Sequence, residues 1–230
     1  EVEIGARCVL HGHVTLEGPT TIGPENEFYP YCAIGGRSQD LKYTGGPTFL
    51  KIGSGNTFRE FVTVHRGTSP GESTTVGNGG CFLAYCHIAH DCVVGDGVIF
   101  SNNGTLAGHV NVADNVILGG LSAIHQFCRV GRHALTGGCS KIVQDVPPFM
   151  LADGNPARVR GVNSVGLQRH NFPEGQIRAL KEAYKTIYKR NLNVAAAISE
   201  LKESNAAEET NHPVNELIAF VEASQRGIIH

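Results

Sequence analysis

Histidines and one carboxylate gather in a short central segment of the chain. Residues 86–92 read CHIAHDC, and the triplet AGH follows at residues 107–109. A neutral imidazole has a pKa near neutrality, so His90 can act as a general base toward a hydroxyl nucleophile. The neighbouring Asp91 can fix the tautomer of that ring and stabilise the imidazolium that forms. The N–H of Gly108 allows a substrate to approach closely and can stabilise an oxyanion, so these three residues together predict acyl transfer.

A six-residue repeat would position these side chains. Its large residues are Ile4, Leu10, Leu16, Ile22, Phe28, Ile34, Ile52, Phe58, Val64 and Val76, then every sixth residue to Ile142. Small side chains, many of them cysteine or valine, follow four positions later. A helix requires apolar spacings of three and four and an amphipathic strand a spacing of two, so this period predicts a prism of short parallel strands, three per coil. With about 18 residues per coil, His90 stacks below Gly108 and Asp91 below His109, at the ~4.8 Å spacing of adjacent strands.

The repeat is interrupted twice and then ends. Residues 35–51 and 68–75 are rich in Gly, Pro and Ser, which predicts loops that leave the coil. After Pro147 and Pro148 the period is lost, and apolar spacings typical of amphipathic helices begin at Pro173, at 194–201 and at 214–221. We therefore expect a β-helix domain over 1–154 and a helical domain over 155–230.

Composition limits the class of protein. The chain of 230 residues is 41% hydrophobic and 17% charged, with a net charge of −2, which is typical of a globular protein. It contains neither a ~20-residue apolar run nor a leader segment, so we expect a cytoplasmic protein without an integral membrane segment. We expect no nucleic-acid partner. The seven cysteines form no CxxC pair, which favours buried free thiols over disulfides or a metal site.

The hexads, with the motifs SQDLKY, VHRGT, HIAHDC, AGH, HQFC and QDVPP, resemble the hexapeptide-repeat acyltransferases. The motifs are most similar to the UDP-N-acetylglucosamine O-acyltransferase family. The resemblance implies a mainly β fold, a left-handed parallel β-helix with a C-terminal α-helical appendage, assembled as a homotrimer. The family usually has more coils upstream, so N-terminal coils are expected to be missing here.

The resemblance also implies an activity and its partners. The chain would move a 3-hydroxyacyl group from acyl carrier protein to the 3-position of UDP-N-acetylglucosamine, the first step of lipid A biosynthesis. His90 would take the proton from the sugar 3-hydroxyl, with Asp91 orienting it and the amide of Gly108 stabilising the oxyanion. No separate cofactor is implied, because the acyl group arrives on the phosphopantetheine of the carrier.

Further residues receive binding roles from the same resemblance. Three would contact the sugar: Asp40, His87 and His109. Gln39 and Lys42 would lie near the diphosphate or the acyl chain, and His65 is another binding candidate. Four would hold the nucleotide: His125, Gln126, Asn163 and Arg169. Gly138 matches the position that measures acyl-chain length, and a glycine there predicts a long chain.

The remaining histidines are not expected to contact a substrate. The remaining histidines are interpreted as surface or structural: His11, His13, His133, His170, His212 and His230. The chain reads GLQRHNF where the family commonly reads GLKRRGF, so His170 stands in place of a basic residue.

Residues 129–190 contain eleven Lys or Arg against four Asp or Glu, and such a basic face could steer an acidic carrier protein.

Three alternatives remain open from the sequence. A zinc hydratase of the γ-carbonic-anhydrase type could use His65, His87, His90 and His109 as nitrogen ligands, although SQDLKY and HQFC would then have no role. A non-catalytic repeat scaffold would not require His90 or Asp91. Other hexapeptide N- or O-acyltransferases share the hexads, and the sequence does not distinguish a 3-hydroxyl from a 3-amino acceptor.

Overall fold

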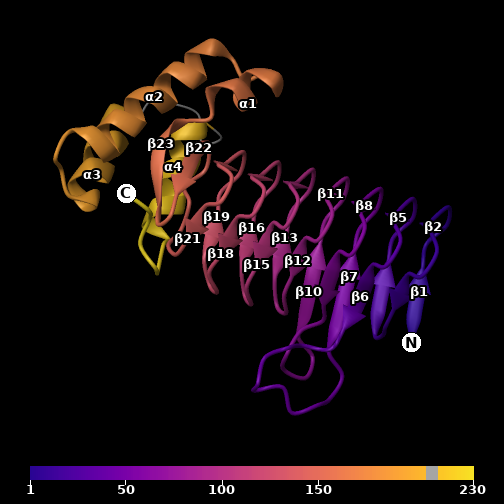
Figure 1. Cartoon of the computed structure of the whole chain (residues 1–230). Coiled ribbons are helices and arrows are strands. Elements are labelled where there is room, and N and C mark those ends of the chain that lie inside the picture. The colour runs from indigo at the N-terminus through magenta and orange to yellow at the C-terminus, as the bar shows by residue number, and fades with distance from the viewer. Residues whose placement is uncertain (206–211) are drawn as a thin grey trace.

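Three parallel sheets form the sides of a long prism, and helices cover one end of it (Figure 1). The computed structural model describes residues 1–205 and 212–230. Within those residues, no helix combines the length and the apolar character that a membrane crossing requires.

Each sheet takes every third strand of the chain as far as β21, and β22 and β23 then both join the second sheet. The first sheet consists of β1 (Val2–Ile4), β4 (Thr20–Ile22), β7 (Phe49–Ile52), β10 (Ser73–Val76), β13 (Val93–Val94), β16 (Asn111–Val112) and β19 (Arg129–Val130). The second consists of β2 (Val9–Leu10), β5 (Glu27–Phe28), β8 (Thr57–Phe58), β11 (Cys81–Phe82), β14 (Ile99–Phe100), β17 (Ile117–Leu118), β20 (Leu135–Thr136), β22 (Met150–Gly154) and β23 (Ala157–Val162). The third consists of β3 (Thr15–Leu16), β6 (Ala33–Gly36), β9 (Thr63–His65), β12 (His87–Ile88), β15 (Thr105–Leu106), β18 (Ala123–Ile124) and β21 (Lys141–Ile142). This arrangement confirms the predicted parallel β-helix.

The register between neighbouring strands follows the repeat. Phe82 pairs with Phe100 and His87 pairs with Thr105, each 18 residues further on. The large residues of the repeat point inward, and Phe28, Phe58 and Phe82 stack with ring centroids 4.9 and 4.8 Å apart. Side chains from successive coils therefore fill a narrow core, as the alternation of large and small residues predicts.

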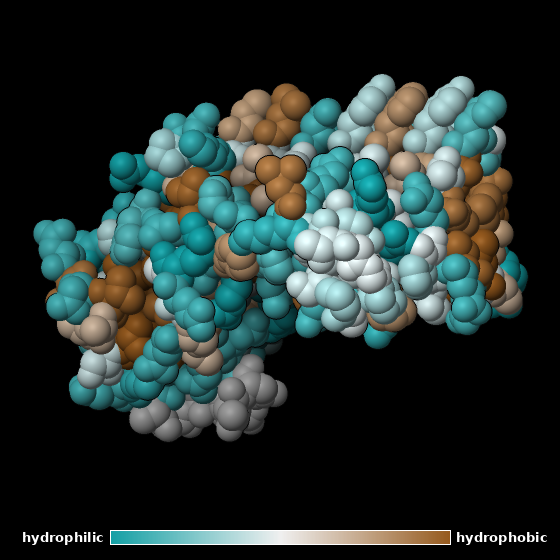
Figure 2. All heavy atoms as spheres, turned by 90° about the horizontal axis from the view of Figure 1, so that it is seen from below, coloured by the Kyte–Doolittle hydropathy of each residue, from teal (hydrophilic) through white to brown (hydrophobic). Residues whose placement is uncertain are grey.

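The core column is buried only from the second coil onward. Ile22 is 2% exposed, whereas Ile4 and Leu10 are 46% and 42% exposed. Figure 2 shows hydrophobic residues gathered at this N-terminal end of the prism.

The turns between sheets have one backbone geometry in common. In many of them the second residue has a positive φ, for example 58° at Asp91 and 60° at His109. We call the column formed by the turns 90–91, 108–109 and 126–127 the His90 corner, which joins the third sheet to the first. The column of turns that joins the second sheet to the third carries His13, Tyr31, Phe61 and Tyr85, and we call it the aromatic corner.

Two loops leave the coil, close to where the sequence predicts them. They cover 37–48 and 66–72, and they project from the same region of the prism (Figure 1). The predicted ranges, 35–51 and 68–75, are too wide where they include residues of strands. Phe49 pairs with Ser73 and Lys51 with Thr75, because β7 and β10 resume the parallel register immediately after each loop.

The C-terminal segment contains more than helices. The helices α1 (Ser164–Arg169), α2 (Glu174–Lys189), α3 (Val194–Ser204) and α4 (Pro213–Glu222) include the three that the apolar spacing predicts, and α1 was not predicted. The segment from 155 begins instead with β23, which pairs antiparallel with β22 and extends the second sheet. A salt bridge of 2.7 Å between Arg132 and Glu216 ties α4 to the prism. His133, 4% exposed at this junction, has its pKa lowered to about 4 by burial and by the charge of Arg132, which agrees with a structural role.

Candidate active site

His90 and Asp91 form a hydrogen-bonded pair at the turn of their coil. The Nδ1 atom of His90 lies 2.8 Å from Oδ2 of Asp91. The other carboxylate oxygen of Asp91 accepts the N–H of Thr68 at 3.1 Å, and the Asp91 N–H donates to Oγ1 of Thr74 at 2.8 Å. A carboxylate that accepts from Nδ1 leaves Nε2 as the unprotonated, basic nitrogen of the neutral ring. The pair therefore holds a base in one tautomer and one orientation.

Gly108 lies directly against the His90 ring. A Cβ atom at Gly108 would be 2.2 Å from Cε1 and 2.5 Å from Nε2 of His90, so no larger residue fits while the ring keeps its position. In the described part of the chain, the Gly108 N–H donates no hydrogen bond, a property that other turns of the coil share. What distinguishes this amide is its place beside a base. The base and an available donor are thus adjacent, as acyl transfer requires.

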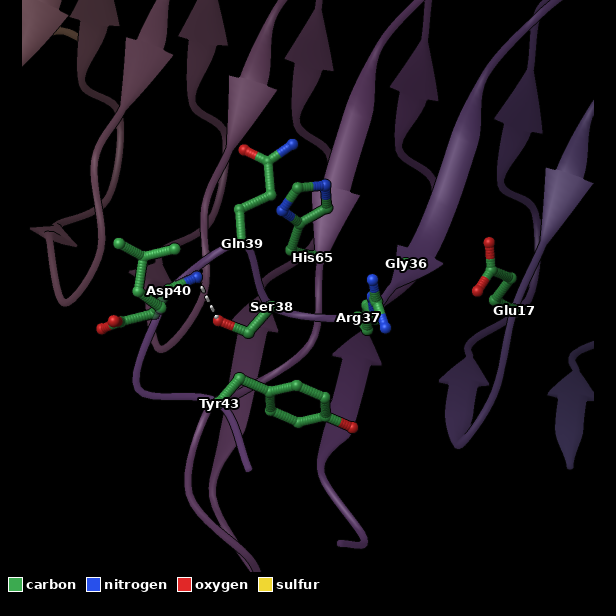
Figure 3. Close-up of a pocket in the computed structure, with 9 residues that line it drawn as sticks. Glu17, Gly36, Arg37, Ser38, Gln39, Asp40, Tyr43 and His65 are labelled. Carbon is green, nitrogen blue, oxygen red and sulfur yellow. Dashed lines mark hydrogen bonds between the residues drawn. The ribbon is translucent and has the colours of Figure 1, made fainter. Parts of the chain in front are cut away.

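The loop over 37–48 brings a second carboxylate to the His90 ring. Oδ2 of Asp40 lies 3.9 Å from Nε2 of His90. The Asp40 N–H donates to Oγ of Ser38 at 3.1 Å, as Figure 3 shows, and that hydroxyl lies 2.6 Å from Oγ1 of Thr68. The two ejected loops therefore hold each other beside the His90 corner. Gln39 and Lys42 lie on the same loop with exposed side chains.

His65 and His87 form a second, more buried pair. Their ring centroids are 4.9 Å apart, edge to face. Burial lowers the pKa of His65, and it lowers the pKa of His87 to about 4, so both rings are neutral at pH 7. Nδ1 of His87 lies 2.6 Å from Oγ1 of Thr63, whereas Nδ1 of His65 is buried without a hydrogen-bond partner among the described residues. His65 also lines a cavity of about 640 Å³ beneath the loop that carries Asp40 (Figure 3).

His109 connects the pair of His90 and Asp91 to the next rung of the His90 corner. Its ring is 5.1 Å from the His90 ring and stacks on Phe127 at 4.7 Å. Nε2 of His109 lies 3.7 Å from Oδ2 of Asp91. The structure thus brings together most of the residues predicted for catalysis and sugar binding.

The residues predicted to hold the nucleotide are divided between the upper rung of the His90 corner and the start and end of α1. His125 and Gln126 are exposed, with Gln126 at the His90 corner one rung above Gly108, and Arg169 is exposed at the end of α1. The side chain of Asn163 accepts the N–H of Gly166 at the start of α1 and donates to the carbonyl of His133 at 3.0 Å. Both the oxygen and the nitrogen of the Asn163 side-chain amide are therefore engaged in hydrogen bonds within the fold.

Gly138 belongs to a different corner from His90. It is the first residue of a turn on the aromatic corner, three turns above that of Tyr85 and two above that of Asn103 in the same column. A Cβ atom at Gly138 would meet only the carbonyl oxygen of Gly120, at 3.5 Å, so the position is open. Within one chain, the width of the third sheet separates Gly138 from the pair of His90 and Asp91.

Several residues that support the site were not predicted. Thr63, Thr68, Thr74 and Ser38 bond to site residues, but hydroxyl side chains in strands and loops are too common to single out. Phe127 could have been recognised, because it lies 18 residues after His109 in the repeat.

One cluster could hold a cation. Ligand atoms of Asp40, His90 and His109 lie within 4.8 Å of one another, the only such group of three or more in the residues that the structure describes. The four histidines of the zinc-hydratase alternative do not converge in this way, because His65 and His87 face each other instead.

Comparison with known proteins identifies the family. The model of "UDP N-acetylglucosamine O-acyltransferase, domain 2" matches residues 145–229. A relative from Verminephrobacter eiseniae, an acyl-[acyl-carrier-protein]–UDP-N-acetylglucosamine O-acyltransferase, is 46% identical over an alignment of 220 residues that covers 93% of this chain and 82% of the relative. The chain belongs to the UDP-N-acetylglucosamine O-acyltransferase family.

Solved UDP-N-acetylglucosamine O-acyltransferases agree with this assignment over the whole chain. The enzyme from Moraxella catarrhalis is 39% identical and superposes with a TM-score of 0.94, covering 100% of this chain and 88% of the other. The protein from Acinetobacter baumannii is 42% identical with a TM-score of 0.92, covering 100% and 89%. The resemblance seen in the motifs is therefore confirmed, for the left-handed β-helix and for its helical appendage.

Proposed function

We propose that this chain transfers a 3-hydroxyacyl group from acyl carrier protein to the 3-position of UDP-N-acetylglucosamine, the first step of lipid A biosynthesis, with His90 as general base. The relatives named above support the reaction. One observation carries the mechanism: Asp91 engages Nδ1 of His90, which leaves Nε2 directed toward Gly108 and Asp40.

The chemical step needs no group beyond the two substrates and these residues. Nε2 of His90 takes the proton from the sugar 3-hydroxyl while that oxygen bonds to the thioester carbon. The Gly108 N–H stabilises the resulting oxyanion, and Asp91 stabilises the imidazolium. Collapse of the intermediate breaks the C–S bond, and the departing thiolate takes the proton from His90. The carrier then leaves with its phosphopantetheine thiol free, and no further cofactor is required.

Sugar binding uses the groups around His90. Asp40 can accept a hydrogen bond from a sugar hydroxyl, and His109 lies on the next rung. The neutral ring of His87 can either donate or accept at Nε2, because its Nδ1 is engaged by Thr63. His65 lines the adjoining cavity. Gln39 and Lys42 extend from the loop over 37–48 toward solvent, where a diphosphate could meet them.

Two of the remaining predicted roles require a second copy of the chain. Arg169 for the nucleotide and Gly138 for the acyl length lie apart from His90 within one chain, whereas Gln126 lies at the His90 corner with His125 beside it. We infer that a homotrimer brings such residues of one copy to the His90 corner of the next. Asn163 would then act through its cap on α1 rather than by a free amide. The seven free cysteines fit a cytoplasmic location, where thiols stay reduced.

An acyl-transfer assay tests the proposal. Purified protein should acylate UDP-N-acetylglucosamine from 3-hydroxyacyl carrier protein, and long chains should react faster than short ones. A coenzyme A thioester donor and a 3-amino acceptor sugar distinguish the related transferases. Light scattering would measure the oligomer, and metal analysis would test the cluster of Asp40, His90 and His109. Stoichiometric zinc in protein that hydrates CO₂ and transfers no acyl group would overturn the assignment.

A further inference from the structure

A second cavity adjoins the His90 corner on the side of the helical appendage. It has a volume of about 610 Å³, and His109 and Phe127 form its wall toward the catalytic pair. Its other wall includes Arg129 at the start of β19 and the C-terminal residues Gln225 and Arg226. None of these three residues has a role in the mechanism above.

Two guanidinium groups face this cavity without a negative partner. Nearby Arg132 is paired with a glutamate, but neither Arg129 nor Arg226 has a carboxylate oxygen within 4 Å in the residues described. The Arg129 guanidinium lies 4.1 Å from the ring centroid of Phe220, which holds it in place and leaves its edge available. Among the described residues, Nε of Arg226 is buried without a hydrogen-bond partner, and its Nη2 donates to the carbonyl of Val143 at 3.4 Å. The same side chain also interacts with the Cys128 thiol.

The one carboxylate that lines the cavity is already committed. Asp145 is 1% exposed. Its two carboxylate oxygens accept hydrogen bonds from the backbone N–H of Arg129 and from the Ser224 hydroxyl, each at 2.8 Å. These bonds fix the C-terminal segment against the prism. The cavity therefore keeps an excess of positive charge from two positioned arginines.

We propose that Arg129 and Arg226 form a phosphate-binding subsite for one of the two substrates. Planar guanidinium groups suit phosphate oxygens, and a partly enclosed site strengthens the attraction. The inference rests on the proposed function, because both substrates carry phosphate: the nucleotide sugar as a diphosphate and the donor as the phosphodiester of phosphopantetheine. The Phe127 rung lies two coil spacings, or ~10 Å, above His90, so a substrate held at His90 extends into the cavity.

Two arginine variants and two probes test the subsite. Arg129→Gln and Arg226→Gln would be titrated calorimetrically with UDP and separately with 4′-phosphopantetheine, on the full chain in its native oligomer. Arg178→Gln on α2 is the matched control, because it removes the same charge from an exposed residue far from the cavity. Losing a charge-assisted hydrogen bond should weaken the binding of the relevant probe by about tenfold. The KM of the substrate that carries this phosphate should rise by a similar factor.

The outcomes separate the sources and the hypotheses. Weaker UDP binding assigns the subsite to the acceptor, weaker phosphopantetheine binding assigns it to the donor, and weaker binding of both shows that it serves both. The subsite is wrong if both probes bind both variants within twofold of the wild type, or if the wild type binds neither. Should Arg226→Gln unfold, Arg129→Gln decides, since it disturbs no backbone contact. Binding that depends on these arginines in protein without acyl-transfer activity would instead retain the subsite and reject the proposed function.

Discussion

Two corners of the same prism are built alike and carry different chemistry. At the His90 corner, φ is 58° at Asp91 and 60° at His109; at the aromatic corner it is 62° at Phe61 and 65° at Tyr85. Both corners stack side chains from successive coils about 5 Å apart. The repeat thus dictates the backbone and the spacing at both, whatever side chains occupy the turns.

The difference lies in what surrounds the turns. Both ejected loops fold over the His90 corner. There the Asp91 carboxylate accepts a hydrogen bond from the Thr68 N–H, and the Asp91 N–H donates one to the Thr74 hydroxyl. At the aromatic corner, Tyr31 and Tyr85 remain 51% and 55% exposed. A site therefore arises where suitable turn residues coincide with insertions that cover them and fix their orientation. Substitutions at matched turn positions can test this distinction.

The largest effect is expected for His90→Ala. Without the base, the sugar hydroxyl must lose its proton to water, and kcat should fall by about 10³-fold. Tyr31→Ala, in a turn of the aromatic corner, is the control and should leave kcat within about threefold, since surface positions away from a site contribute little. Steady-state kinetics on trimeric, folded protein would measure both. Equal losses in the two variants would remove the distinction between the corners.

Gly108→Ala should be nearly as damaging. The added Cβ would lie 2.2 Å from Cε1 of His90, so the ring must move from Asp91 or from the substrate. A misplaced base should cost about 10²-fold in kcat, with little change in the free energy of unfolding. Gly12→Ala is the control, because it occupies the same turn position on the aromatic corner and its Cβ would meet nothing within 4 Å. A fully active Gly108→Ala enzyme would show that the ring need not stay where the structure places it.

These matched positions also show what the sequence could and could not predict. Periodicity places His90 below Gly108 and Asp91 below His109, because the coil length fixes which residues stack. The loops have no period, so the approach of Asp40 to His90 and the contact of Ser38 with Thr68 could not be derived from spacing. The β22–β23 hairpin was missed for a related reason: its antiparallel pairing begins where the hexads end.

Gly138→Met tests whether the aromatic corner contributes to specificity rather than to chemistry. The new side chain fits the protomer, since the nearest atom to its Cβ would be the Gly120 carbonyl oxygen at 3.5 Å. It would occupy space at the position predicted to measure acyl-chain length, so the ratio of kcat/KM for long over short acyl chains should fall by about tenfold or more. Competition between carrier proteins of different chain length measures this ratio directly. An unchanged ratio would remove Gly138 from the acyl site, whereas an equal loss with every donor would indicate a general disturbance of the fold.

The smallest effect is expected for Phe61→Ala, at a part of the aromatic corner where the rings only stack on one another. The Phe61 ring lies 5.0 Å from Tyr31 and 4.9 Å from Tyr85, in near-parallel pairs. Because Phe61 is itself 42% exposed, Phe61→Ala should lower the free energy of unfolding by only about 1 kcal/mol, mainly through lost stacking. Urea unfolding, with the oligomer monitored by light scattering, would measure the change. A loss of several kcal/mol, or dissociation of the oligomer, would mean that another copy covers this corner, and the contrast with the His90 corner would then lie in what each one binds.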